Sequence, residues 1–138
     1  MTTLPSPLTG AFAGHQYLNL ETFRRSGAGV RTPVWFAEDQ GCLFIRTEAT
    51  SGKVKRVRHQ GRVRIAPSDA QGNPRGAWIE ALAQLAPPDQ SELAQHLFRR
   101  KYGLQLRGFE AMMRLRRGSW ATLRIDPLVA PIPEGGEQ

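Results

Sequence analysis

The chain has 138 residues, of which 40% are hydrophobic and 22% are charged, as expected for one globular domain and not for a disordered chain. Nineteen Lys and Arg residues against twelve Asp and Glu residues give a net charge of +7, which favours anionic partners such as phosphate-bearing cofactors, nucleic acid or anionic membranes. No apolar run is long enough to span a membrane, no signal-peptide pattern is present and Cys42 is the single cysteine; this excludes a transmembrane helix and an internal disulfide framework, and we expect a cytoplasmic protein.

Strand patterns dominate the first two-thirds of the chain, after a loose lead-in over residues 1–10. Apolar and polar residues alternate there with a period of two, and Gly-rich or polar turns separate the runs. A polar hairpin turn is predicted over 38–41. The predicted strands cover residues 17–23, 30–37, 42–47, 62–66, 76–85 and, near the end of the chain, 119–126.

Three helices are predicted, over residues 52–59, 89–102 and 106–117. Ser51 is the N-cap candidate of the first helix and Asp89 that of the second. Gly103 is placed to end the second helix as a C′ glycine. Leu93 and Leu97 are expected on its apolar face; Phe109, Met112 and Met113 form the apolar stripe of the third helix.

Six strands with short connections, followed by late helices, are typical of a small antiparallel barrel with helices packed on it. We therefore expect a mainly β protein that forms a single domain over residues 1–138, with a core over about 14–126 and a Pro- and Gly-rich tail over 127–138. The βαβ rhythm and the GxGxxG motif of a dinucleotide-binding fold are absent.

The segment Arg46–Arg58 (RTEATSGKVKRVR) is the sharpest chemical feature of the sequence. A predicted helix opens at Ser51-Gly52-Lys53, and the unpaired N–H groups at a helix N-terminus bind phosphate well. Lys53 adds a mobile charge and Arg46 a planar fork of donors. The segment is either a phosphate cradle or a capped surface helix with a solvated basic face.

Pro33 lies in the second predicted strand, within the run Thr32-Pro33-Val34-Trp35-Phe36. Proline cannot donate to a sheet ladder, so it marks a sheet edge, a bulge or a gap. Beside Trp35, such a strand offers free backbone groups and a flat apolar surface to a planar ligand. The alternative, favoured for Val34 and Phe36, is that these side chains belong to the core.

Three motifs occur in order along the chain: T-x-x-x-x-G-x-x-x-x-T-P-V-W from Thr22, R-T-x-x-x-S-G-K-x-x-R from Arg46, and R-V-x-x-A-x-x-D from Arg62 with its G-x-P-x-G turn. Together they resemble the pyridoxamine 5′-phosphate oxidase-like split β-barrel family, and more narrowly its PPOX-class, coenzyme F420-dependent oxidoreductase branch. The resemblance covers roughly residues 14–126. The sequence departs from the branch at Glu80-Ala81, where members of the branch often have a Glu-Gly pair.

The resemblance implies a homodimer that holds FMN or, preferably, coenzyme F420 in a groove between its subunits. Lys53 would hold the cofactor phosphate, helped by Arg46, Thr47, Ser51 and Gly52. The backbone of Thr32, Pro33, Val34 and Trp35 would lie along the ring system. Arg56 would lie within reach of the anionic end, and Trp78 would face the site from the second subunit.

The function implied is hydride transfer between the cofactor and an unidentified small organic substrate. No catalytic residue is identified, and His15, His59 and His96 show no metal-site spacing. One alternative is a non-catalytic flavin- or haem-binding protein of the same fold. Basic residues concentrate in two stretches, over 53–64 and 99–117. A nucleic-acid-binding protein is nevertheless disfavoured, because the only aromatic residues within these stretches are Tyr102 and Phe109, and no known nucleic-acid-binding motif occurs.

Overall fold

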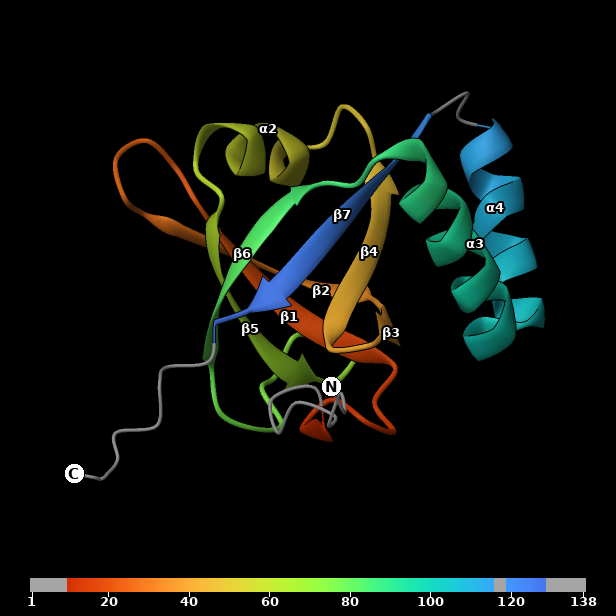
Figure 1. The fold of residues 1–138 in the computed structure, drawn as a ribbon, viewed down its shortest axis with the longest axis horizontal. Coiled ribbons are helices and arrows are strands. Elements are labelled where there is room, and N and C mark those ends of the chain that lie inside the picture. Colours follow the sequence, from red (N-terminus) through yellow and green to blue (C-terminus); the bar gives the residue numbers. More distant parts are fainter. Residues whose placement is uncertain (1–9, 116–118, 129–138) are drawn as a thin grey trace.

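Seven antiparallel strands form one strongly curled sheet (Figure 1), in the order β2-β1-β5-β6-β7-β4-β3. The computed structural model describes residues 10–115 and 119–128, and only the backbone of residues 113–115. Most of the expected lead-in and tail, and the end of the third predicted helix, lie outside the described residues. The strands are β1 (Tyr17–Phe23), β2 (Gly29–Trp35), β3 (Ala37–Asp39), β4 (Cys42–Glu48), β5 (Arg62–Ser68), β6 (Ile79–Leu85) and β7 (Trp120–Pro127).

The predicted strand count of six was wrong, because the predicted strand over residues 30–37 divides at Phe36. Tyr17 is paired with Trp35 at the beginning of β1, so the chain beyond Trp35 has no partner there. Residues 37–39 pair with β4 instead, with Ala37 opposite Phe44. The turn that follows is therefore shorter than predicted, with positive φ at Gln40 (46°) and Gly41 (87°), as a two-residue hairpin turn requires.

In the part of the chain that the structure describes, three helices with defined bounds cover parts of this sheet: α2 (Gly52–His59), α3 (Pro88–Tyr102) and α4 (Leu104–Leu115). Ser51 caps α2 as predicted, and Gly103, at φ 55°, ends α3. The predicted N-cap at Asp89 was wrong: Pro87 occupies the cap position and Pro88 the first turn, where the fixed φ of proline favours helix initiation.

The buried face of α3 also differs from the prediction. Ala94, Phe98 and Tyr102, each four residues apart, are buried, whereas Leu93 is 38% exposed. Leu97 is only partly buried at the edge of the same cluster. The face containing Ala94 is the one that meets β3 and β4, so the sheet selects which stripe of the helix is buried.

The hydrophobic core has two parts, one on each side of the sheet. The larger lies inside the curl, where Leu18, Leu20, Ile45 and Leu123 are fully buried. There α2 closes one end of the curl and adds Val57 to this cluster. The smaller cluster lies outside the curl, between α3, α4 and strands β3 and β4 (Figure 1). This outer layer forms one wall of the site described below.

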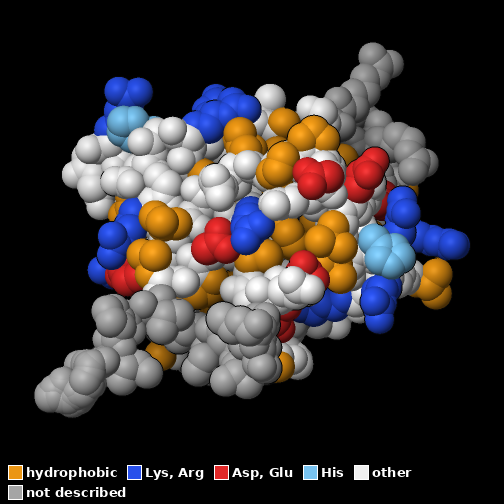
Figure 2. Space-filling model, in the orientation of Figure 1, with side chains coloured by type: hydrophobic (Ala, Val, Ile, Leu, Met, Phe, Trp, Pro, Cys, Tyr) orange, Lys and Arg blue, Asp and Glu red, His pale blue; other side chains and the backbone are white. Residues whose placement is uncertain are grey.

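The surface carries the excess of basic residues unevenly. In Figure 2 the Lys and Arg side chains lie mainly around the margin of the visible face, over α2 and the neighbouring β1–β2 hairpin at the top and along both sides, while hydrophobic side chains occur nearer its centre. None of the helices in the described part of the chain has the length and apolar composition needed to cross a membrane.

Candidate functional site

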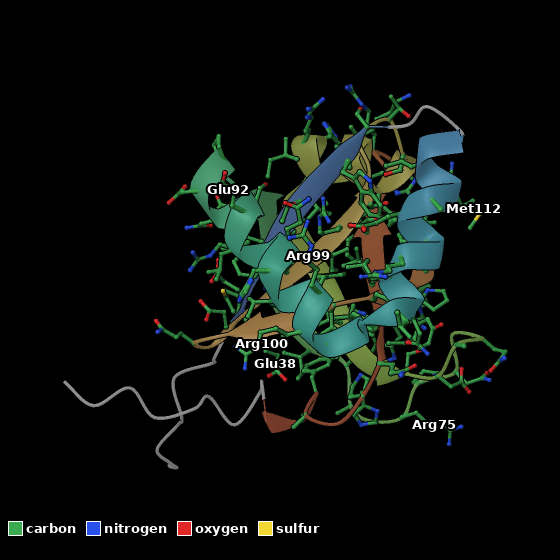
Figure 3. The ribbon with its side chains drawn as sticks, turned by 90° about the vertical axis from the view of Figure 1, so that its right-hand side faces the viewer. Glu38, Arg75, Glu92, Arg99, Arg100 and Met112 are labelled. Atoms are coloured by element: carbon green, nitrogen blue, oxygen red, sulfur yellow. The ribbon has the colours of Figure 1, made fainter. Side chains whose placement is uncertain are left out.

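A groove with a volume of about 380 Å³ lies between β2 and β4 and extends to α4. Strand β2 is one edge of the sheet, so the curl brings this edge near the outer face of β4 without closing the gap. Figure 3 looks onto the α3–α4 layer, with Arg99 on α3 and Met112 on the side of α4 that points away from α3. The groove is lined by Tyr17, Thr32, Pro33, Val34, Trp35, Arg46, Thr47, Glu48, Lys53, Phe109 and Met112.

One end of the groove is apolar and aromatic, with Trp35 at its centre. The indole ring stacks on Tyr102, with centroids 4.3 Å apart and planes 10° apart. The Phe109 ring contacts the Trp35 indole edge-on, with ring centroids 5.5 Å apart. Phe109 in turn contacts Trp120 edge-on, with ring centroids 4.9 Å apart. These offset and edge-on contacts are the favoured geometries of aromatic pairs. Trp35 is thus held in one orientation by packing on two sides.

The end of α3 binds the backbone at Phe36, where the strand is interrupted between β2 and β3, and so fixes the position of Trp35. We call this interruption the backbone break. The Tyr102 hydroxyl accepts a hydrogen bond from the Phe36 N–H (3.0 Å) and lies 2.6 Å from the Gln16 carbonyl, to which it donates. The Phe36 carbonyl accepts from Lys101 Nζ at 2.9 Å. Buried backbone groups need such partners, and neither neighbouring strand supplies them where the chain passes from β2 to β3.

The other end of the groove is polar, and Arg46 is a buried cation there. Its side chain is 7% exposed, with the guanidinium 4.5 Å from the ring centre of Trp120. Its closest carboxylate oxygen, Glu110 Oε2, lies 3.9 Å from Nη1. Arg46 Nε and Nη1 are buried and have no hydrogen-bond partner among the residues that the structure describes. Burial lowers the pKa of Arg46, an effect that Glu110 opposes and Arg99 strengthens.

Lys53 and Glu48 complete the polar end. Burial is the main cause that lowers the pKa of Lys53; Arg56 lowers it further, and Glu48 raises it. Glu48 therefore lies close enough to influence the lysine, yet it forms no ion pair with any side chain that the structure describes. Arg46 and Glu48 are two residues apart on β4, so both side chains leave the same face of the strand.

The start of α2 differs from the expected cradle. Ser51 Oγ accepts from the Val54 N–H at 3.4 Å, which makes it a helix cap. A Cβ at Gly52 would lie 2.7 Å from Arg56 Nη1, so the arginine occupies the space beside the glycine. Arg56 Nε donates to Thr22 Oγ1 at 2.6 Å. Ser51, Gly52 and Arg56 are absent from the groove lining.

Trp78 is also outside the groove. Its ring lies under the Arg31 guanidinium, 4.6 Å away, next to the β2 edge of the sheet. The expectation that it faces the site from a second subunit stays a prediction.

The groove thus brings together seven of the eleven residues proposed from the sequence, in two groups from β2 and from the β4–α2 segment, and leaves out four. Sequence reasoning missed Tyr17, Glu48, Phe109 and Met112. The signals for three of them were present: Glu48 follows Arg46 at strand spacing, and Phe109 and Met112 lie three residues apart in a helix pattern. In the part of the chain that is described, no cluster of His, Cys, Asp and Glu could hold a metal ion.

Comparison of the sequence with protein-family models and with curated protein sequences finds no match. Comparison of the structure finds similar folds. The haem storage protein HutZ from Vibrio cholerae is 14% identical at a TM-score of 0.64, over 94% of this chain and 93% of that one. A candidate pyridoxamine 5′-phosphate oxidase from Listeria innocua is 14% identical at 0.59, over 88% and 91%.

An FAD-binding protein from Mesorhizobium loti is 12% identical, with a TM-score of 0.59 over 88% of this chain and 86% of that one. These likenesses establish the fold: this chain has the split-barrel architecture of pyridoxamine 5′-phosphate oxidase-like proteins. Proteins with this architecture include both cofactor-binding and haem-storing members.

Proposed function

We propose that this split-barrel protein binds a flavin or deazaflavin in the β2–β4 groove and transfers hydride between it and a small organic substrate. Coenzyme F420 is the preferred cofactor and FMN the second choice, following the resemblance of the three sequence motifs. The proposal is supported by the fold, which an FAD-binding protein shares, and by the two chemically different ends of the groove.

The observation that carries the proposal is the state of Arg46. The Arg46 side chain is 7% exposed, and its buried Nε and Nη1 have no hydrogen-bond partner in the described part of the chain. Leaving buried charged donors unpaired is costly. An anionic group bound in the groove would pair these donors and relieve that cost, and a phosphate fits the planar fork of the guanidinium.

The residues present fit a ligand with a planar ring and an anionic end. Pro33, Val34 and Trp35 would contact the ring, and the outer edge of β2, which pairs with no other strand of the sheet, would offer backbone donors and acceptors to its rim. Arg46 and Lys53 would hold the anion. The bound cofactor would supply the hydride-accepting ring system, while the protein contributes orientation, electrostatics and exclusion of water.

We further propose a homodimer with the cofactor at the subunit interface. The interior of the curl is filled by core side chains, so a tricyclic ligand can bind only on an outer groove. A second subunit is the natural cover for such a groove. Sedimentation at micromolar concentration should give about twice the chain mass of 15.4 kDa, and a monomer under these conditions would contradict the dimer.

A non-catalytic role as a flavin or haem carrier is the alternative function, and the likeness to a haem storage protein favours it. Within the described residues no histidine lines the groove, and Tyr17, Lys53 and Met112 are the side chains there that could ligate haem iron. Turnover of reduced F420 or reduced FMN with candidate acceptors would separate the two functions. A catalyst would reoxidise the cofactor as it reduces the acceptor, whereas a carrier would not.

The direct test is titration of the purified protein with F420, FMN and haemin, followed by fluorescence and absorbance. We expect saturable binding of F420 or FMN, weakened by about 1–3 kcal/mol in Lys53→Ala and in Arg46→Ala, the usual range for a charge-assisted hydrogen bond. Arg62→Ala is the matched control, because Arg62 is half-exposed and outside the groove. Unchanged affinity in both groove variants would refute the site.

A further inference from the structure

The polar end of the groove contains a carboxylate that a simple anion site would not need. Glu48 lines the groove beside Arg46 and Lys53, and it is close enough to Lys53 to raise the pKa of that lysine. It has no ion-pair partner in the described part of the chain. Because Glu48 lines the groove, its charge acts on an anion bound there.

Carboxylates offset part of the positive charge at this end. Two cations, Arg46 and Lys53, are matched by two carboxylates, Glu48 and Glu110. Arg56 and Arg99 add positive potential from outside the groove lining. Glu48 thus offsets part of the attraction that these cations exert, and its repulsion acts more strongly on a doubly charged anion than on a singly charged one.

We propose that Glu48 makes this groove select a singly charged phosphodiester over a doubly charged phosphomonoester as the headgroup of its ligand. This inference rests on the proposed function and refines it, because F420 carries a phosphodiester and FMN a phosphomonoester. A phosphomonoester carries close to two charges at pH 7, and Coulomb energy is proportional to the charge of the ligand. Repulsion by Glu48 is accordingly about twice as large for the monoester.

The test uses three ligands that share one ring and differ in headgroup charge: riboflavin, which is neutral; riboflavin 4′,5′-cyclic phosphate, a singly charged phosphodiester; and FMN. Their affinities are measured by flavin fluorescence at pH 7.5 and low ionic strength, for the wild type and for Glu48→Gln. Glu80→Gln is the matched control, because it makes the same charge change on β6, outside the groove.

We expect Glu48→Gln to leave riboflavin affinity unchanged, to raise that of the cyclic phosphate by roughly threefold to tenfold, and to raise that of FMN by roughly the square of that factor. Glu80→Gln should change none of them by more than about twofold. Equal gains for the two phosphates, the same gains in Glu80→Gln, or a loss of riboflavin affinity in Glu48→Gln would each overturn the inference. The last result would mean that Glu48 holds a ligand hydroxyl.

The outcomes also separate this inference from the proposed function. Saturable binding of all three flavins with no effect of Glu48→Gln would overturn the role of Glu48 and leave flavin binding intact. A failure of all three ligands to bind to either protein would overturn flavin binding itself, and with it the inference.

Discussion

Replacement of Tyr102 by phenylalanine tests how the backbone break beside the groove is held. The Phe36 N–H is buried and donates to the Tyr102 hydroxyl at 3.0 Å. In Tyr102→Phe this N–H loses its acceptor, while the ring keeps its stacking on Trp35 at 4.3 Å. The variant therefore removes hydrogen bonds without opening a cavity in the aromatic cluster.

The expected cost follows from that geometry. An unsatisfied buried N–H costs about 1–3 kcal/mol. The Phe36 carbonyl keeps its hydrogen bond from Lys101, so it adds little. We expect the free energy of unfolding to fall by about 1–3 kcal/mol, a large part of the total of about 5–15 kcal/mol that is typical of a domain.

Urea unfolding followed by tryptophan fluorescence measures this change, with the m-value expected to stay constant. The control is Tyr17→Phe: the Tyr17 hydroxyl makes no hydrogen bond to the described residues, and its loss should cost under about 0.5 kcal/mol. Hydrogen exchange at the Phe36 amide should accelerate only in the Tyr102 variant. If the two variants lose equal stability, the hydroxyl does not hold the break.

Three further results are expected. Ser51→Ala should lower the free energy of unfolding by about 0.5 kcal/mol, the low end for an N-cap, because the capping hydrogen bond is 3.4 Å long. The variant should leave ligand affinity unchanged, and a loss of affinity as large as in Lys53→Ala would contradict the assignment of Ser51 as a cap. Gly52→Ala should change the free energy of unfolding by less than about 1 kcal/mol, because only the movable end of Arg56 occupies the Cβ position; a larger loss would mean that the arginine is rigidly held. Burial lowers the pKa of Lys101 from 10.5 to about 8. Between these pH values the unfolded chain binds a proton that the folded chain lacks, so the free energy of unfolding should rise with pH. Urea unfolding at pH 7.5 and 9.5 should show this rise in the wild type and not in Lys101→Met, and an equal rise in both proteins would contradict the pKa shift.

The local features of this fold were predictable because they depend on neighbouring residues. Alternation of apolar and polar residues located β1, and an apolar run after a polar turn located β4, each within a residue of its ends. Ser51 and Gly103 marked helix termini through caps that lie within one turn. Strand β3 was not predictable in this way. It exists because β1 begins opposite Trp35, and the place where a strand loses its partner is a property of two segments far apart in the sequence.

The candidate site shows the same division. The sequence by itself determined which segments carry the anion-binding and ring-contacting residue types, Thr32–Trp35 and Arg46–Lys53. Only the tertiary structure decided that the curl of the sheet sets these segments on two sides of one groove and that Arg56 donates to Thr22 outside that groove. It also decided that Nε and Nη1 of Arg46 are buried without a hydrogen-bond partner among the described residues. Side-chain type is a local property, but burial and pairing depend on what the rest of the chain brings alongside.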